Sequence, residues 1–234
     1  PDNTYTFRQD SSFLYFFGIN HPGFAGVIDV EAGEETLFGN DFTMDDIIWM
    51  GPQPSVASQA AEVGVEKSAP LSQLKQVIEA AQLQGRQVHF LPPYRHANKL
   101  WLEELTGIRV AQLAAQVSVE LIKAIVALRS VKSALEIAEI ERACDIGYEM
   151  HTTAMRMCKP GVKEQLIAGT IEGIALAHGA GVSFPTILSM NGETLHNHYH
   201  GNLLQEGRLM LTDAGAETNM NYCSDFTRTM PVGG

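Results

Sequence analysis

Two acidic residues near the C-terminal end of the chain, Asp213 and Asp225, constrain the fold more than any other feature of the sequence. In a strand over 208–213, side chains alternate between the two faces, so that Leu209, Leu211 and Asp213 share one face and the acid ends an apolar row. The segment 222–230 is rich in β-branched and aromatic residues and carries Asp225 on one face together with two threonines. A glycine and a polar run at 215–221 supply the turn. The pattern predicts a β-hairpin that brings both carboxylates to one side of a sheet.

Two carboxylates that lie close together repel each other unless a cation lies between them. A metal ion is the natural cation for such a pair. Carboxylate oxygens and imidazole nitrogens suit Mn²⁺, Zn²⁺ or Co²⁺, and the order of affinities alone does not choose between these ions. We therefore expect a divalent metal site at Asp213 and Asp225.

The composition is that of an ordinary globular protein. The chain has 234 residues, 45% hydrophobic and 18% charged, which is enough for two modest cores. A net charge of −11 disfavours nucleic-acid binding, and the sequence has no apolar run of about 18 residues for a membrane span. Three cysteines without ligand-like spacing (Cys144, Cys158 and Cys223) predict reduced thiols and a cytoplasmic location. Since the sequence begins with Pro1 rather than Met, we expect upstream residues to have been removed.

The first half of the sequence alternates strand and helix patterns. Residues 4–18 are dense in aromatic side chains and predict a strand, and residues 26–30 and 35–38 flank a turn and predict a hairpin. The segment 72–84 has the apolar spacing of an amphipathic helix, and residues 88–91 predict a short strand that ends at two prolines. This alternation predicts a small α/β domain.

The pattern changes to long helices near Gln116, where we place a domain boundary. Residues 119–128 predict one helix. Ser133 has the position of an N-cap, with Glu136 completing a capping box, at the start of a long second helix. A third helix is expected over 163–178, so that the second domain is α+β.

Two longer motifs in the sequence resemble motifs of one protein family. DAGAE at 213–217, followed by YCSDFTRTMP at 222–231, resembles the first metal-ligand segment of the aminopeptidase P/prolidase family, the pita-bread-fold metallopeptidases. Leu195-His196, seventeen residues before Asp213, matches the family's Leu-His element, and residues 128–146 resemble the entry into its catalytic domain. The step from Asp213 to Asp225 is twelve residues where the family has eleven. We expect the additional residue in the hairpin loop around Asn219.

The resemblance implies a fold and its extent. Residues 1–115 would form an α/β creatinase/prolidase-like N-terminal domain whose own start is missing. Residues 116–234 would form the first half of an α+β pita-bread catalytic domain. The family completes its metal site with a later histidine and two later glutamates, and the sequence stops at Gly234, so two of five protein ligands are present. We therefore expect this stretch of chain to bind metal weakly and to be inactive alone.

The resemblance also implies an activity: a metal-dependent Xaa-Pro aminopeptidase that cleaves the peptide bond before proline with a metal-bridged water. Asp213 and Asp225 would bind two divalent ions, with Mn²⁺ expected first and Zn²⁺ or Co²⁺ as alternatives. His196 would stabilise the tetrahedral intermediate. The substrate would be a peptide with proline at its second position, and the complete enzyme would be a homodimer. The sequence does not separate an aminopeptidase from an Xaa-Pro dipeptidase.

Other interpretations stay open from the residues alone. The two aspartates could be surface residues at strand ends, and His196 could be a structural imidazole. His198 and His200 alternate with His196, would share its face if the segment were a strand, and are expected to be hydrated or to support other ligands. The alternative function is a pita-bread-fold module that binds peptides or proteins without catalysis.

Overall fold

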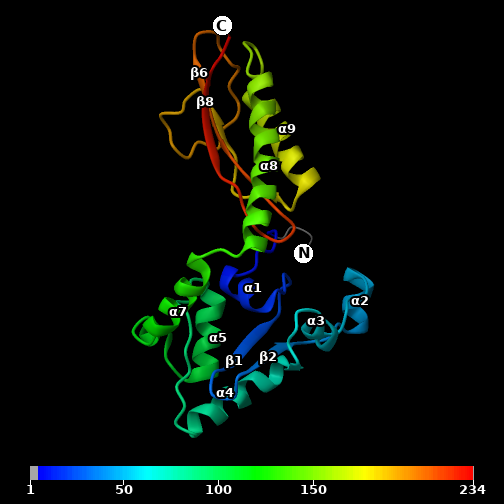
Figure 1. Ribbon diagram of the computed structural model, residues 1–234, viewed down its shortest axis with the longest axis vertical. Helices are drawn as coiled ribbons and strands as arrows, with labels where there is room; N and C mark the ends of the chain where they lie inside the picture. The colour runs from blue at the N-terminus through cyan, green and yellow to red at the C-terminus, as the bar shows by residue number, and fades with distance from the viewer. Residues whose placement is uncertain (1–4, 234) are drawn as a thin grey trace. The chain divides into compact units, whose positions relative to one another are not determined.

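The computed structural model describes residues 5–233, and the chain divides into two compact units between Arg129 and Ser130. The first unit contains the elements α1 (Ser11–Phe17), β1 (Ala25–Asp29), β2 (Glu34–Gly39), α2 (Met44–Met50), α3 (Val56–Glu62), β3 (Lys67–Pro70), a 3₁₀ turn (Leu71–Gln73), α4 (Leu74–Leu83), α5 (His96–Thr106), α6 (Val110–Leu113) and α7 (Val119–Ser130). The second unit contains α8 (Ala134–Met157), α9 (Glu164–His178), β4 (Gly181–Val182), β5 (Ile187–Ser189), β6 (Leu209–Ala214), β7 (Ala216–Glu217) and β8 (Phe226–Pro231) (Figure 1).

The units divide later than the boundary expected near Gln116, because α7 is attached to elements of the first unit. Ser118, just before α7, donates its backbone N–H to the carbonyl of Phe90 at 3.4 Å. At the other end of the helix, the guanidinium of Arg129 lies 5.6 Å from the centre of the Tyr15 ring. By these contacts α7 belongs with the elements that precede it.

The first unit has a three-stranded sheet in the order β1-β2-β3. β1 and β2 form the antiparallel hairpin that the sequence predicts, and β3 runs parallel to β2. The carboxylate of Asp29 accepts hydrogen bonds from the backbone N–H groups of Glu31 and Ala32 in the turn, and Gly33 supplies the left-handed conformation there (φ 67°).

The strand predicted over residues 4–18 is wrong, apart from residue 4, which lies outside the described residues. Residues 11–17 form α1, because Asp10 caps the helix by accepting from the N–H groups of Ser12 and Phe13. The aromatic residues follow the helical spacing of four, and the Phe13 and Phe17 rings stack at 5.1 Å. Local capping therefore decides this segment over the strand propensity of its aromatic residues.

The helix predicted over 72–84 is confirmed as α4, preceded by the 3₁₀ turn. The short strand predicted over 88–91 is wrong, because within the described part of the chain these residues have no regular secondary structure and pair with no strand. They are held instead by the residue before α7: His89 Nδ1 lies 2.7 Å from the hydroxyl of Ser118.

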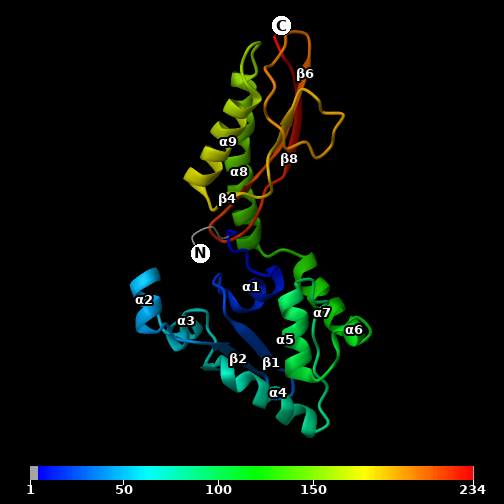
Figure 2. The same ribbon diagram turned by 180° about the vertical axis from the view of Figure 1, so that it is seen from behind.

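The second unit packs two long helices against one face of a sheet, as the sequence predicts (Figures 1 and 2). The sheet has the order β5-β6-β8, with every pair antiparallel, and β4 pairs separately with β7. α8 begins with the predicted capping box, in which Ser133 and Glu136 satisfy each other's backbone N–H groups. In the part of the chain that the structure describes, none of the helices is long and apolar enough to cross a bilayer.

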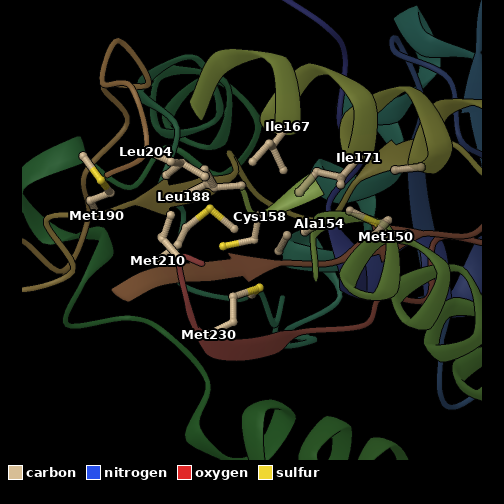
Figure 3. Packing of buried hydrophobic residues seen from close by; sticks show 14 of the residues in the cluster. Met150, Ala154, Cys158, Ile167, Ile171, Leu188, Met190, Leu204, Met210 and Met230 are labelled. Carbon is tan, nitrogen blue, oxygen red and sulfur yellow. The ribbon is translucent and has the colours of Figure 1, made fainter. Parts of the chain in front are cut away.

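The core of the second unit lies between the helices and the sheet (Figure 3). It is built from buried side chains of α8, α9, the strands and the loop before β6, among them Met150, Ala154, Ile167, Ile171, Leu188, Leu204, Met210 and Met230. The residues of β6 that take part have even numbers, so the odd-numbered residues, which include Asp213, face away from the helices. The core thus fixes which face of the sheet carries the aspartate.

Two glycines in the helices give a test of this packing. Gly169 lies exposed in the interior of α9 with no atom within 4 Å of an added Cβ, so Gly169→Ala should raise the free energy of unfolding by about 0.5–1 kcal/mol. Gly147 in α8 lies under the ring of Phe226, where an added Cβ would come within 2.8 Å of a ring carbon. Gly147→Ala should therefore lower the free energy of unfolding. Urea denaturation of both variants checks the pair, and equal effects would contradict the packing of α8 on the hairpin.

Candidate metal centre

The hairpin of β6 and β8 places the two aspartates on one face of the sheet. Asp213 pairs with Thr227, and the same register continues past the end of β8 to an isolated bridge between Glu217 and Cys223. Because side chains alternate along a strand, Asp225, two residues before Thr227, shares the face of Asp213. An unbroken register between the two acids means that no bulge intervenes.

The loop of the hairpin follows the bridge between Glu217 and Cys223. Residues 218–222 form the connection, in which the N–H of Thr218 donates to the carbonyl of Tyr222 and the N–H of Asn221 donates to that of Thr218. Asn221 adopts a left-handed conformation (φ 63°), which asparagine tolerates better than most residues.

The two carboxylates differ in burial. Asp225 is exposed, and its neighbours Ser224 and Phe226 turn toward the other side of the sheet, where Ser224 is 4% exposed. Asp213 is partly buried, and its Oδ1 atom is buried without a hydrogen-bond partner among the described residues. A buried carboxylate oxygen without a donor is costly, so it indicates a missing cation or donor.

Gly215 was expected to lie in the turn, but the structure places it before the turn, between β6 and β7, where the register aligns it with Asp225. A Cβ at this position would overlap the carbonyl oxygen of Ser224 and lie 2.6 Å from the hydroxyl of Ser183. The Gly215 carbonyl accepts from the N–H of Ser183 at 3.1 Å. The glycine is needed because two backbones approach closely beside the aspartates.

One buried imidazole supports both aspartates from behind the sheet. His151 in α8, 5% exposed, lies with its Nε2 3.0 Å from the carbonyl oxygen of Ala214, and since a carbonyl only accepts, Nε2 donates. Its ring packs edge-on against Phe226, with centroids 6.0 Å apart. His151 thus contacts the residue that follows each aspartate. The sequence does not predict this contact, because His151 lies 63 residues from Ala214 in the chain.

The histidine segment, residues 196–202, runs beside β5 in an irregular conformation rather than as a strand. His198 and His200 place their Nδ1 atoms 3.4 Å and 2.9 Å from the carbonyl oxygens of Thr186 and Leu188. His196 lies in an exposed turn, and within the described residues no hydrogen bond joins it to either aspartate. The structure therefore places the two aspartates on one face of the sheet, and among the described residues His196 has no hydrogen bond to either of them.

The residues present suit a divalent metal but form only part of a site. The Oδ1 of Asp213, which has no partner in the described part of the chain, and the exposed carboxylate of Asp225 offer hard oxygen ligands on one face. Across residues 5–233, no group of three or more His, Cys, Asp or Glu side chains is close enough to hold an ion. Two carboxylates rarely bind a metal tightly without further ligands.

Comparison with known proteins defines the class to which this arrangement belongs. Residues 1–91 match the aminopeptidase P N-terminal domain, and residues 138–234 match metallopeptidase family M24. The chain belongs to the aminopeptidase P/prolidase family, and its second unit is the beginning of a pita-bread domain.

Individual relatives agree with this assignment. The chain is 32% identical to the Xaa-Pro aminopeptidase of Escherichia coli K12 over all of its own length and 55% of that protein. It superimposes on the solved low-pH form of E. coli aminopeptidase P with a TM-score of 0.84 and 28% identity, covering 100% of this chain and 55% of that one. A structure of the same enzyme with the inhibitor Pro-Leu matches with a TM-score of 0.84, 29% identity and the same coverage. The chain therefore spans about half the length of these relatives.

Proposed function

We propose that the complete protein is a metal-dependent Xaa-Pro aminopeptidase in which Asp213 and Asp225 are metal ligands. The observation that carries the proposal is the uninterrupted hairpin register, which puts both carboxylates on the open face of the sheet, with Asp213 Oδ1 unpartnered among residues 5–233. Membership of a metallopeptidase family supports a divalent ion at this position. We expect Mn²⁺ first, with Zn²⁺ and Co²⁺ as alternatives. All three ions accept carboxylate and imidazole ligands.

The proposed substrate is a peptide with proline at its second position. The amide bond before proline has no N–H, so a protease that relies on that donor for recognition loses a contact. A divalent metal, when bound, lowers the pKa of a water molecule and polarises the scissile carbonyl, and neither effect needs the missing N–H. The part of this chain is to hold two carboxylates on one rigid hairpin, with Gly215 and His151 fixing the backbone between and behind them.

We propose that His196 donates a hydrogen bond to the oxygen that gains charge in the transition state. His196 lies in an exposed turn, so its imidazole is accessible to a substrate. Preorganised donors of this kind stabilise a developing oxyanion more than the ground-state carbonyl.

The test uses the complete protein, loaded with Mn²⁺, on an Arg-Pro-Pro type peptide. Cleavage after the first residue that stops with a chelator and returns with metal is the expected result. Cleavage that persists with the chelator would contradict the metal dependence, and no cleavage of any Xaa-Pro peptide would favour the non-catalytic binding module instead.

Replacement of His196 separates the two proposed roles. His196→Ala in the complete protein should leave metal content unchanged and lower kcat by about 10²–10³, the usual cost of one oxyanion donor. Metal analysis and steady-state kinetics on the same preparation check this, with His178→Ala, at an exposed position at the end of α9, as the control. A loss of metal from the His196 variant would make this residue a ligand rather than a donor.

A further inference from the structure

A second buried carboxylate lies in this unit, outside the proposed metal centre. Glu164, the first residue of α9, is 0% exposed. Its Oε1 accepts from the backbone N–H of Met190 at 2.7 Å and from the hydroxyl of Ser189 at 3.3 Å, and its Oε2 accepts from the side-chain amide of Asn202 at 3.0 Å. These three donors are neutral. Burying a carboxylate is costly even with such partners, so its place in the fold calls for an explanation.

Through Ser189, the carboxylate reaches the beginning of the histidine segment. The hydroxyl of Ser189 donates to Glu164 and accepts from the side-chain amide of Asn197 at 3.3 Å. It also accepts from the backbone N–H of Asn191 at 3.0 Å, so its one donor and both lone pairs are used. Asn197 lies between His196 and His198 in the chain. A continuous line of hydrogen bonds therefore joins Glu164 to the residue beside His196.

The end of the histidine segment is attached to the same helix terminus. The backbone N–H of Glu164 donates to the carbonyl of Asn202 at 3.0 Å, and the N–H of Gln165 donates to that of His200 at 2.9 Å. The N-terminal N–H groups of a helix have no partners within the helix, so they are free to bind this segment. Together with the Asn202 amide, these bonds fix the segment from its far side.

We propose that Glu164 is a positioning residue, which holds the histidine segment in one conformation against β5 and so fixes where the His196 imidazole can reach. The inference rests on the proposed function for its catalytic consequence. Its structural part, that the carboxylate orients the histidine segment, stands independently. An irregular segment with an exposed histidine needs such an anchor, because a displacement of about 1 Å at a catalytic group can cost 10²-fold in rate.

Exchanging the acid and the amide between positions 164 and 202 gives a sharp test. Asn202→Asp places two carboxylates 3.0 Å apart and should detach the segment. Glu164→Gln with Asn202→Asp moves the acid to the other side of the same contact, where the glutamine amide can donate to it. The double variant should therefore restore the attachment of the histidine segment that the single variant Asn202→Asp loses. Ser189→Ala removes the hydroxyl that connects Glu164 to Asn197 and adds no charge. It replaces Asn202→Asp in the experiment if that variant does not fold.

Two readouts on the complete protein distinguish positioning from general stabilisation. With ¹⁵N-labelled histidine in the metal-free protein, Asn202→Asp and Ser189→Ala should shift the imidazole signals of His196, His198 and His200, and the double variant should restore them. With metal and peptide, Asn202→Asp should lower kcat by about 10–100-fold with little change in KM, as for other residues that orient a catalytic group. Ile167→Ala, a fully buried core change one turn further along α9, is the control for lost stability.

The outcomes separate this inference from the proposed function. Unchanged imidazole signals in Asn202→Asp and Ser189→Ala, or equal shifts in Ile167→Ala at the same loss of melting temperature, would overturn the positioning role. If the imidazole signals shift in the two variants but the wild-type protein cleaves no Xaa-Pro peptide, the structural role of Glu164 is supported and the proposed function is refuted.

Discussion

Replacing Asp225 with asparagine in the complete protein should abolish turnover and lower the content of bound divalent metal in the same preparation. An amide oxygen is a neutral and weaker ligand than a carboxylate, so the site loses both charge and affinity. The metal supplies several kcal/mol of transition-state stabilisation, and at about 1.4 kcal/mol per factor of ten its loss should cost at least about 10²–10³ in kcat. Metal analysis after dialysis and peptide hydrolysis with added metal measure both effects.

The companion variant Asp213→Asn adds a readout that needs no metal. Asp213 Oδ1 is buried without a donor in the described structure, so the metal-free protein carries an unfavourable charge there. Removing that charge should leave the thermal stability of the metal-free protein equal or higher, while metal binding and turnover are lost. Equal or higher stability together with lost activity is the typical result of replacing a functional residue that lowers the stability of the protein.

A control aspartate completes this experiment. Asp45 is exposed in α2 of the first unit, and Asp45→Asn should change neither metal content nor kcat. If Asp225→Asn retains full metal content and full turnover, Asp225 is not a ligand, and the same result for Asp213→Asn would exclude Asp213. If Asp213→Asn unfolds the metal-free protein, the carboxylate has a structural role instead.

The parts of the fold that the sequence predicts are those with a strong local signal. In β6 the side chains alternate between the two faces of the sheet with a period of two, which predicts the face of Asp213. The start of α8 is predicted by the capping box of Ser133 and Glu136. Local signals also misled: the aromatic residues before Gly18 have strand propensity, but the cap at Asp10 makes the segment a helix. Propensity is weak compared with a cap that satisfies backbone N–H groups.

The supporting residues of the candidate site could not be predicted, because their contacts depend on tertiary packing. His151 is 63 residues from Ala214 in the chain, and Glu164 is 38 residues from Asn202. At each position the sequence shows only a polar residue in a helix, which is normally exposed or capping. A polar residue on the apolar face of a predicted helix, as His151 is, was the one available signal for such a contact.

The other large effect is expected at Gly215. Gly215→Ala should lower the free energy of unfolding by about 3 kcal/mol or more, at the upper end of the cost of inserting a methyl group into packed structure. The new Cβ would overlap the carbonyl oxygen of Ser224. Since that atom belongs to the backbone, no change of rotamer relieves the overlap. The strands would have to separate between Asp213 and Asp225.

The variant Gly207→Ala is the matched control, because it tests backbone conformation without crowding. Gly207 lies in the turn before β6 at φ 77°, with open space around an added Cβ, so the expected cost is about 1–2 kcal/mol from the left-handed conformation alone. Gly215 does not have a positive φ, so its larger cost would come entirely from the close approach of two strands. Urea denaturation of both variants measures the difference, and metal titration of the complete protein should show weakened binding for Gly215→Ala only. If Gly215→Ala unfolds at the wild-type midpoint, then the hairpin is not closed at Ser224, and the shared face of the two aspartates loses its support.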